Sequence, residues 1–271
     1  MRKYLIYTSA GSSANVRFWV SKKDRDYDVW ITNYSGIPGL NREYADFYNE
    51  RSGSKIPNLH QVYRENPNFF KSYKAIMVMD DDVIISPKSL NQLFNLLEIN
   101  DLWMLQPAFS RFGKISHPIT RRRLTTRLRY VNFVEITCPI IRTDKLLEFL
   151  DVYTPSLPTI VGIDYWLPYF WGINHTDKYA ISDQYYCINP RDYFKKEHKH
   201  VIDKISNSKD RAAMVNSILK QLGIREFKYQ EFSSIRRPLI QQINGLPLYL
   251  AEIVFDFLWS LASSAKQVLQ K

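Results

Sequence analysis

Three consecutive aspartates, Asp80, Asp81 and Asp82, follow an apolar run at Ala75–Met79. Adjacent carboxylates repel one another, and a divalent cation such as Mg²⁺, held by oxygen atoms, relieves that conflict. Because residues two apart point to the same side of a strand, Asp80 and Asp82 can reach one ligand while Asp81 turns aside. The pattern predicts a metal site, and it also fits a solvated acidic turn or a cluster favoured by the dipole of a following helix.

The elements that must position these carboxylates are short apolar strands that alternate with helices. Strands are expected at Tyr4–Thr8, Tyr27–Thr32, Ala75–Met79, Leu102–Gln106 and Phe133–Ile141, and helices after Ser86-Pro87 and at Asp144–Leu150. This order predicts an α/β fold with a mostly parallel central sheet flanked by helices. Ligands of such sheets bind at the carboxyl ends of the strands, where the three aspartates would stand.

The chain is expected to contain one large domain over 1–195 and a helical C-terminal extension over 196–271. In the extension, Leu250, Ile253, Val254, Phe257, Leu258 and Leu261 mark one apolar face of a helix, which Phe255 and Trp259 widen. The helix either packs on the domain or contacts a membrane surface or a partner. Its acidic residues Glu252 and Asp256 disfavour an anionic membrane, and the preceding Arg236 and Arg237 favour one.

Composition narrows the functional class. The 271 residues carry a formal net charge of +10, and between Arg111 and Lys145 nine Lys/Arg stand against two acids. Such stretches suit a phosphate-rich ligand, an anionic surface or a solvated face, but no nucleic-acid-reading motif accompanies them. Cys138 and Cys187 lie in apolar runs and are expected to be buried free thiols. We find no signal peptide and no run of ~18–20 apolar residues that would span a bilayer, so a cytoplasmic protein is expected.

Six segments between about residues 73 and 190 form an ordered set. They read YKAIMVMDDDV, LEINDLWMLQPAFS, ISHPITRR, NFVEITCPIIRTD, IVGIDYW and ISDQYYCIN. In order and rough spacing they resemble a family of glycosyltransferase-like proteins of GT-A type, present in plants and bacteria and once catalogued as a domain of unknown function. The resemblance implies a GT-A, Rossmann-like fold, and it does not extend to the C-terminal part of the chain.

On the donor side, the resemblance implies that Asp80 and Asp82 hold Mn²⁺ or Mg²⁺. Asp80 and Asp81, with Ser9 and Gly11 of the small-residue loop after the first strand, would contact a nucleotide-sugar donor. The family has a histidine where this chain has Asn189. Either Asn189 is the third metal ligand, or His175 or His198 takes that place, or the metal is bound weakly.

On the acceptor side, the resemblance implies that Asp164 is the base that takes a proton from the acceptor hydroxyl. Gly162 would permit the turn before it, and a helix N-cap is the alternative role for Asp164. The further candidates for acceptor or phosphate contacts are His117, Thr120, Arg121, Arg122, Glu135 and Trp166. Glu135 also fits a paired structural carboxylate, and Trp166 also fits core packing.

The expected function is therefore metal-dependent transfer of a sugar from a nucleotide sugar to a saccharide or lipid-linked acceptor. Bacterial surface polysaccharide synthesis, such as that of capsule or O-antigen, is the expected setting, with peripheral membrane contact through the C-terminal helix. A metal-dependent nucleotidyl or phosphoryl transferase is the alternative enzyme, although the chain has no Walker-type glycine-rich loop. A basic module that binds nucleic acid or membrane is the alternative outside the enzymes.

Overall fold

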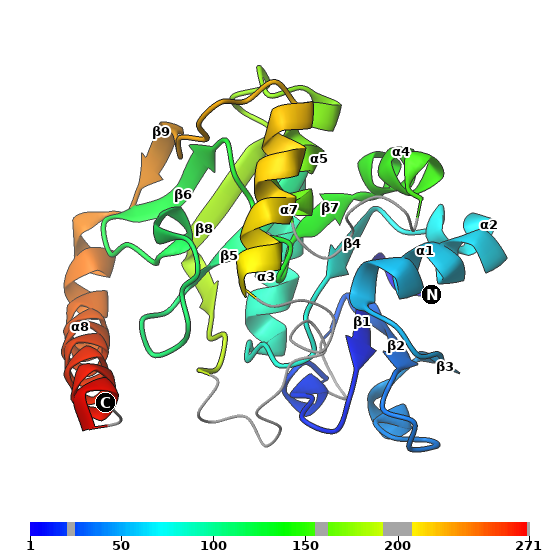
Figure 1. The fold of residues 1–271 in the computed structure, drawn as a ribbon, viewed down its shortest axis with the longest axis horizontal. Helices are drawn as coiled ribbons and strands as arrows, with labels where there is room; N and C mark the ends of the chain where they lie inside the picture. Colours follow the sequence, from blue (N-terminus) through cyan, green and yellow to red (C-terminus); the bar gives the residue numbers. More distant parts are fainter. Residues whose placement is uncertain (21–24, 155–161, 192–207, 270–271) are drawn as a thin grey trace.

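A nine-stranded mixed sheet, in the order β3-β2-β1-β4-β7-β5-β8-β6-β9, organises the chain (Figure 1). The structure, a computed structural model, describes residues 1–20, 25–154, 162–191 and 208–269. The strands are β1 (Tyr4–Ala10), β2 (Tyr27–Asn33), β3 (Phe47–Glu50), β4 (Ala75–Val78), β5 (Met104–Phe109), β6 (Thr126–Val131), β7 (Ile140–Arg142), β8 (Tyr179–Cys187) and β9 (Glu231–Arg236). Strands β6 and β7 run opposite to the others, so most carboxyl ends meet at one edge.

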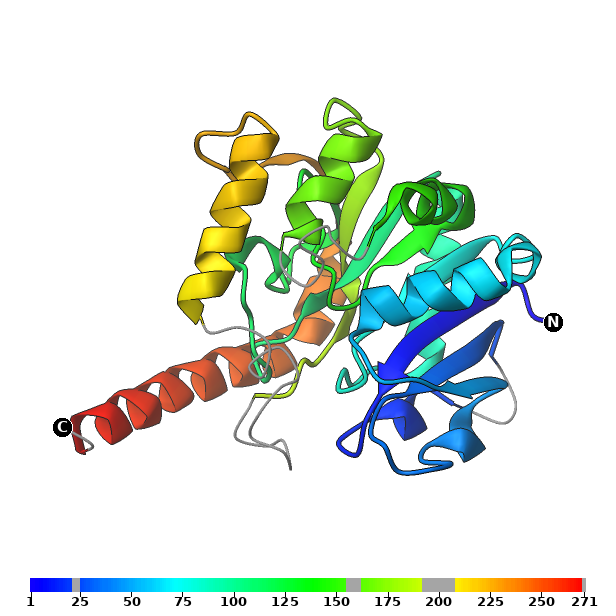
Figure 2. The same cartoon turned by 45° about the vertical axis from the view of Figure 1, so that its right-hand side comes forward.

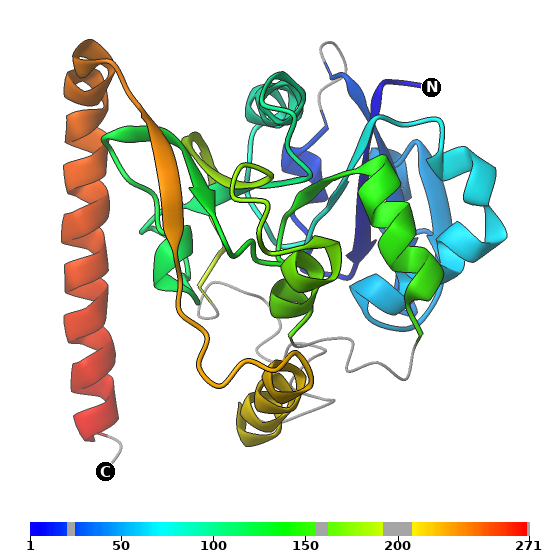
Figure 3. The same cartoon turned by 90° about the horizontal axis from the view of Figure 1, so that it is seen from above.

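Helices cover both faces of this sheet. They are α1 (Lys55–Glu65), α2 (Pro67–Phe70), α3 (Pro87–Ile99), α4 (Thr143–Val152), α5 (Ile163–Trp171), α7 (Ser208–Gln221) and α8 (Leu239–Leu269), with short 3-10 turns η1 (Val16–Phe18), η2 (Arg42–Tyr44) and η3 (Pro118–Thr120). Figure 3 shows α3 on one face and α1, α4, α5 and α7 on the other. Strand β1 is buried on both sides, with Leu5 and Tyr7 in one core and Tyr4 and Ile6 in the other. The expected α/β class is confirmed.

Helix α3 begins as its sequence predicts. The Ser86 hydroxyl accepts a hydrogen bond from the Ser89 backbone N–H at 3.2 Å, and Pro87 occupies the first turn. Leu90 and Leu93 are fully buried on the inner side of the helix. This start fixes where the chain leaves the Asp80–Asp82 turn.

The prediction of a strand at Phe133–Ile141 is wrong for most of that range, because only Ile140–Arg142 pairs in the sheet. Pro139 has no N–H to donate to a ladder. The backbone groups of Ile136 and Thr137 instead bond to Lys55, Asp80 and Asp164. We call this irregular segment, residues 133–139, the connector, because its backbone links the side chains of Lys55 and Asp164 to the aspartate turn.

Cys138 and Cys187 are buried and free, as expected, with their sulfur atoms 3.9 Å apart. The C-terminal part is not only helical, because β9 pairs with β6 and extends the sheet. One helical segment, Leu239–Ala262 of α8, is long and apolar enough to cross a membrane by length and composition. The expectation that no stretch reaches this threshold is therefore wrong.

Candidate active site

The turn after β4 presents Asp80, Asp81 and Asp82 at the carboxyl edge of the sheet. The Asp80 backbone N–H donates to the Thr137 carbonyl at 2.7 Å. Asn15 holds the other side of the turn: its backbone N–H and its side-chain Nδ2 donate to the Asp81 and Asp82 carbonyls, each at 2.6 Å. These bonds fix the backbone of the turn against the fold.

The loop after β1 touches the same turn. The Gly11 N–H donates to Asp81 Oδ2 at 2.8 Å, and the Tyr34 hydroxyl approaches that oxygen at 3.5 Å. A Cβ on Gly11 would lie 2.7 Å from the Tyr34 hydroxyl, so a larger residue at position 11 would displace the Tyr34 side chain. Burial, and then the charges of Asp82 and Asp80, raise the pKa of Asp81 to about 7. A proton or a cation is thus favoured here.

Lys55, the first residue of α1, joins the turn to the connector. Its Nζ lies 2.6 Å from Asp80 Oδ1 and donates to the Ile136 carbonyl at 2.6 Å. The Asp80 side chain remains 44% exposed, so this ion pair leaves it open to solvent. Sequence reasoning missed Lys55, because a lysine at a helix start carries no signal of a distant carboxylate partner.

Two further acids lie beside the connector. The Ile136 backbone N–H donates to Asp164 Oδ1, and the Thr137 hydroxyl donates to Glu135 Oε1 at 2.8 Å. The second Glu135 oxygen is buried without a hydrogen-bond partner. Burial, and next the charge of Asp164, raise the pKa of Glu135 to about 8, and burial raises the pKa of Asp164 to about 6.

Gly162, and not Asp164, is the N-cap residue of α5. Its φ of 97° lies in the left-handed region, which glycine adopts without strain. Asp164 falls in the first turn of the helix, and its carboxylate reaches across to the connector instead of capping its own helix. The N-cap alternative for Asp164 is therefore wrong.

Aromatic rings gather close to the two acids Glu135 and Asp164. His117 Nδ1 and the Tyr229 hydroxyl lie 2.6 Å apart, and both rings pack on Phe133. Tyr165 and Phe227 are in contact at a ring distance of 4.7 Å. Burial lowers the pKa of His117 to about 4, so this imidazole is neutral at ordinary pH. Tyr229 and Phe227 come from the C-terminal part, where the sequence offered no motif.

Several predicted residues have structural partners. Ser9 is buried and accepts a hydrogen bond from Asn58 Nδ2 at 3.2 Å, and the Thr120 hydroxyl donates to the His117 carbonyl at 2.8 Å. Trp166 stacks on Phe170 at 4.6 Å.

Arg121 and Arg122, two of the predicted acceptor or phosphate contacts, have partners within the fold. Arg122 is buried and pairs with Glu252 of α8 at 2.6 Å. The carbonyl of Arg121 accepts a hydrogen bond from Arg129 Nη2 at 3.1 Å. We therefore assign Arg122 to holding α8.

The third metal ligand expected from the sequence was Asn189. The bridge between Ile84 and Ile188 brings Asn189 beside the end of the aspartate turn. His175 packs on Trp103 at the amino end of β5, the opposite edge, and His198 lies outside the described residues. No group of three or more His, Cys, Asp or Glu residues fit to hold a metal occurs in the described parts of the chain. The Asp80 carboxylate is 44% exposed beside its Lys55 partner, so it is open to solvent, and carboxylate oxygens are the ligands that Mg²⁺ prefers.

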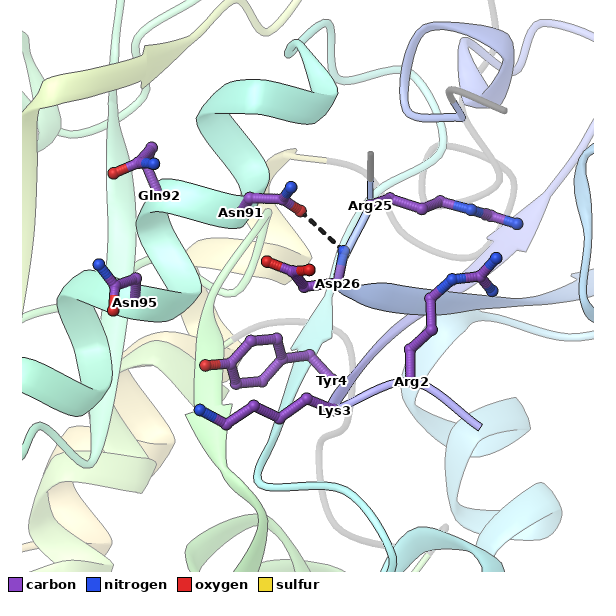
Figure 4. A pocket seen from close by; sticks show the side chains of 8 residues that line it. All are labelled: Arg2, Lys3, Tyr4, Arg25, Asp26, Asn91, Gln92 and Asn95. Carbon is purple, nitrogen blue, oxygen red and sulfur yellow. Dashed lines mark hydrogen bonds between the residues drawn. The ribbon is translucent and has the colours of Figure 1, made fainter. Parts of the chain in front are cut away.

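A separate hollow of about 520 Å³ lies at the amino ends of β1 and β2 (Figure 4). Arg2, Tyr4 and Arg25 line it, and the Asp26 backbone N–H donates to Asn91 Oδ1 there at 3.1 Å. Because ligands of open α/β sheets bind at the carboxyl edge, we locate the chemistry at the aspartate turn and not in this hollow.

Solved structures with a similar fold exist. The chain matches S. aureus TarS 1-349 in complex with UDP-GlcNAc with a TM-score of 0.55 and 12% sequence identity, over 83% of this chain and 68% of that chain. It matches a structure of S. aureus TarS with a TM-score of 0.50 and 10% identity, over 81% of this chain and 43% of that chain. The expected GT-A-like fold is thereby confirmed. The sequence matches no protein-family model and no curated protein, so the family resemblance stays a prediction.

Proposed function

We propose that this protein is a glycosyltransferase that moves a sugar from a nucleotide sugar to a saccharide or lipid-linked acceptor. The observation that carries the proposal is the meeting of the Asp80–Asp82 turn, Lys55 and Asp164 around one connector, at the ligand-binding edge of a GT-A-like sheet. The fold shared with TarS, solved with UDP-GlcNAc, supports a nucleotide sugar as the ligand class. Synthesis of a bacterial surface polysaccharide, such as capsule or O-antigen, is the proposed setting.

On the donor side, Asp80 and Asp82 would hold Mn²⁺ or Mg²⁺, with Asn189 beside them. The bound metal would neutralise the diphosphate leaving group. Gly11 fixes the Asp81 carboxylate through its N–H, and Ser9 lies buried near the end of β1, so the end of β1 and the loop after it would form the wall for the nucleotide. Lys55 places a positive charge next to Asp80.

On the acceptor side, Asp164 is the proposed base. Its carboxylate takes the proton of the acceptor hydroxyl while the acceptor oxygen bonds to the anomeric carbon of the donor sugar. The bond from that carbon to the diphosphate breaks, and the nucleoside diphosphate leaves with the electron pair. A pKa of about 6 suits a base that works near neutral pH. The rings of Tyr165, Tyr229 and His117 form an apolar surface for a sugar face.

Product analysis tests this proposal. The full chain, incubated with a panel of nucleotide sugars, Mn²⁺ and candidate acceptors, should release a nucleoside diphosphate and form a new glycoside. Asp82→Ala should abolish transfer with an unchanged circular dichroism spectrum, whereas Asp26→Ala, which changes an acid of the opposite edge, should retain it. Release of pyrophosphate with transfer of the nucleotide would indicate a nucleotidyl transferase instead. Salt-dependent nucleic-acid binding without donor turnover would indicate a binding module.

A further inference from the structure

Helix α8 turns its apolar side away from the rest of the molecule. We define its outer face by Ile243, Leu250, Val254, Phe257, Leu258 and Leu261, whose side chains are 50–61% exposed. Their spacing of three, four and seven residues places them on one side of a helix. The helix contacts the domain through its opposite side, so the apolar face that its sequence marks is left exposed.

The acidic residues of α8 point toward the domain instead. Glu252 is fully buried and pairs with Arg122 at 2.6 Å, and one turn later Asp256 pairs with Arg191 at 2.8 Å. The segment Leu239–Ala262 contains no lysine, no arginine and no other acid. Rotating the helix to bury its outer face would break the buried ion pair, and an uncompensated buried charge is strongly unfavourable.

The helix extends past the body of the protein along the β9 edge (Figures 1 and 2). Only 6% of the apolar segment is buried, and the segment follows a folded sheet. It is therefore neither a core helix nor a leader peptide. An exposed apolar patch this long marks an interaction surface.

A lipid bilayer fits this surface better than a second copy of the helix. Viewed down the helix axis, at ~100° per residue, the apolar side chains span an arc of roughly 140°, with Ile253 at one edge and Ile240 at the other. A helix that pairs with a second helix needs only a narrow apolar stripe. The charge of +10 favours a membrane that contains anionic lipid. A transbilayer orientation would pull Glu252 away from Arg122 and into the hydrocarbon.

We propose that the outer face of α8 binds the surface of a lipid bilayer, with the helix in the plane of the membrane and fastened to the domain by Arg122–Glu252 and Arg191–Asp256. Phe112, soon after β5, packs on Phe255 at 5.3 Å, and Arg191 lies two residues beyond Asn189. The middle of α8 thus lies beside the edge that carries the candidate active site. If the proposed function holds, this position selects a lipid-linked saccharide as the acceptor class.

Vesicle binding tests the proposal independently of sugar transfer. The full chain should sediment with phosphatidylcholine vesicles, and more strongly when they contain phosphatidylglycerol. The double variant Val254→Gln/Phe257→Gln should lose affinity by roughly tenfold or more. Ile99→Gln is the matched control, because Ile99 is 72% exposed on α3, away from α8. Failure of the wild type to bind either vesicle, or equal binding by the double variant, would overturn the proposal.

Two further readouts distinguish the occupants and orientations. Sedimentation velocity without lipid should give the same molecular mass for the wild type and the double variant. A dimer that is lost in the variant would assign the face to a second copy of the chain.

Fluorophores attached to Ile243→Cys and Leu261→Cys should both be quenched most strongly by lipids that carry a shallow quencher, and to the same extent. A difference in depth between the two positions would contradict an in-plane helix. Donor turnover by the double variant in solution should equal that of the wild type. A failure of the proposed function would therefore be detected independently of membrane binding.

Discussion

Acidic side chains in two regions of this molecule are stabilised in opposite ways. Near α8, Asp183 meets the Arg129 guanidinium at 2.7 Å with both side chains fully buried, and Glu252 meets Arg122. At the carboxyl edge, Asp81 receives the Gly11 N–H, and Asp164 receives the Ile136 N–H. The region near α8 gives its acids cationic partners, whereas the carboxyl edge gives Asp81 and Asp164 neutral donors and pairs only the half-exposed Asp80 with a cation, Lys55.

We interpret the difference as a separation between structural acids and acids that are available to a ligand. A guanidinium cancels the charge of a carboxylate, whereas a backbone N–H fixes its position and leaves most of the charge in place. Burial accordingly raises the pKa of Asp81, Glu135 and Asp164, in the absence of a bound cation. The carboxyl edge is therefore poised for a metal, a proton or a substrate, and the α8 region for stability.

Asp164→Asn gives the largest expected effect. The amide oxygen can still accept the Ile136 N–H, but it cannot take a proton from an acceptor, so kcat should fall by about 10²–10⁴-fold. The midpoint of thermal unfolding should stay close to that of the wild type. Asp144→Asn, at an exposed acid of α4, is the control and should keep full activity. A wild-type kcat in Asp164→Asn would show that this residue is not the base.

Asp183→Asn tests the other region. Removing one partner of a fully buried ion pair should lower the free energy of unfolding by about 3–5 kcal/mol, measured by urea denaturation. Asp177→Asn is the matched control, because Asp177 is 70% exposed and lies 3.6 Å from Lys178. Its effect should stay below about 1 kcal/mol. Equal stability of the two variants would remove the distinction between the regions.

Glu135→Gln gives a smaller effect that depends on pH. The pKa of Glu135 is raised from an ordinary 4.5 to about 8, so the folded state binds more protons than the unfolded state between these values. The stability that Glu135 contributes is fully present below pH 4.5 and is lost as pH rises through about 8. Glu135→Gln should therefore be more stable than the wild type at pH 8.5 and equal to it at low pH, which urea denaturation at the two pH values measures. A difference that does not change with pH would contradict the raised pKa.

The sequence predicted the framework better than the connections within the site. Apolar runs located β1, β2, β4 and β5, because a strand buried on both faces requires such runs. The segment around Glu135 was misassigned, since β-branched and aromatic residues imply a strand although its backbone bonds to side chains from elsewhere.

Long-range partners could not be predicted from local patterns. The pairing of Lys55 with Asp80 joins residues 25 positions apart, and that of Arg122 with Glu252 joins residues 130 positions apart. The orientation of α8 depended on that second pair. Periodicity correctly identified its apolar face but could not tell whether it points inward or outward.

The central claim, that the carboxyl edge binds a nucleotide sugar, is tested most directly by thermal unfolding of the full chain with nucleotide sugars, UDP-GlcNAc among them, with and without Mn²⁺. At least one should stabilise the wild type when Mn²⁺ is present, by about 2.7 kcal/mol at a concentration 100 times its Kd. Asp82→Ala, with the same unfolding midpoint in the absence of ligand, should show no stabilisation. If no nucleotide sugar stabilises the wild type with any divalent metal, or if Asp82→Ala responds equally, the claim is contradicted.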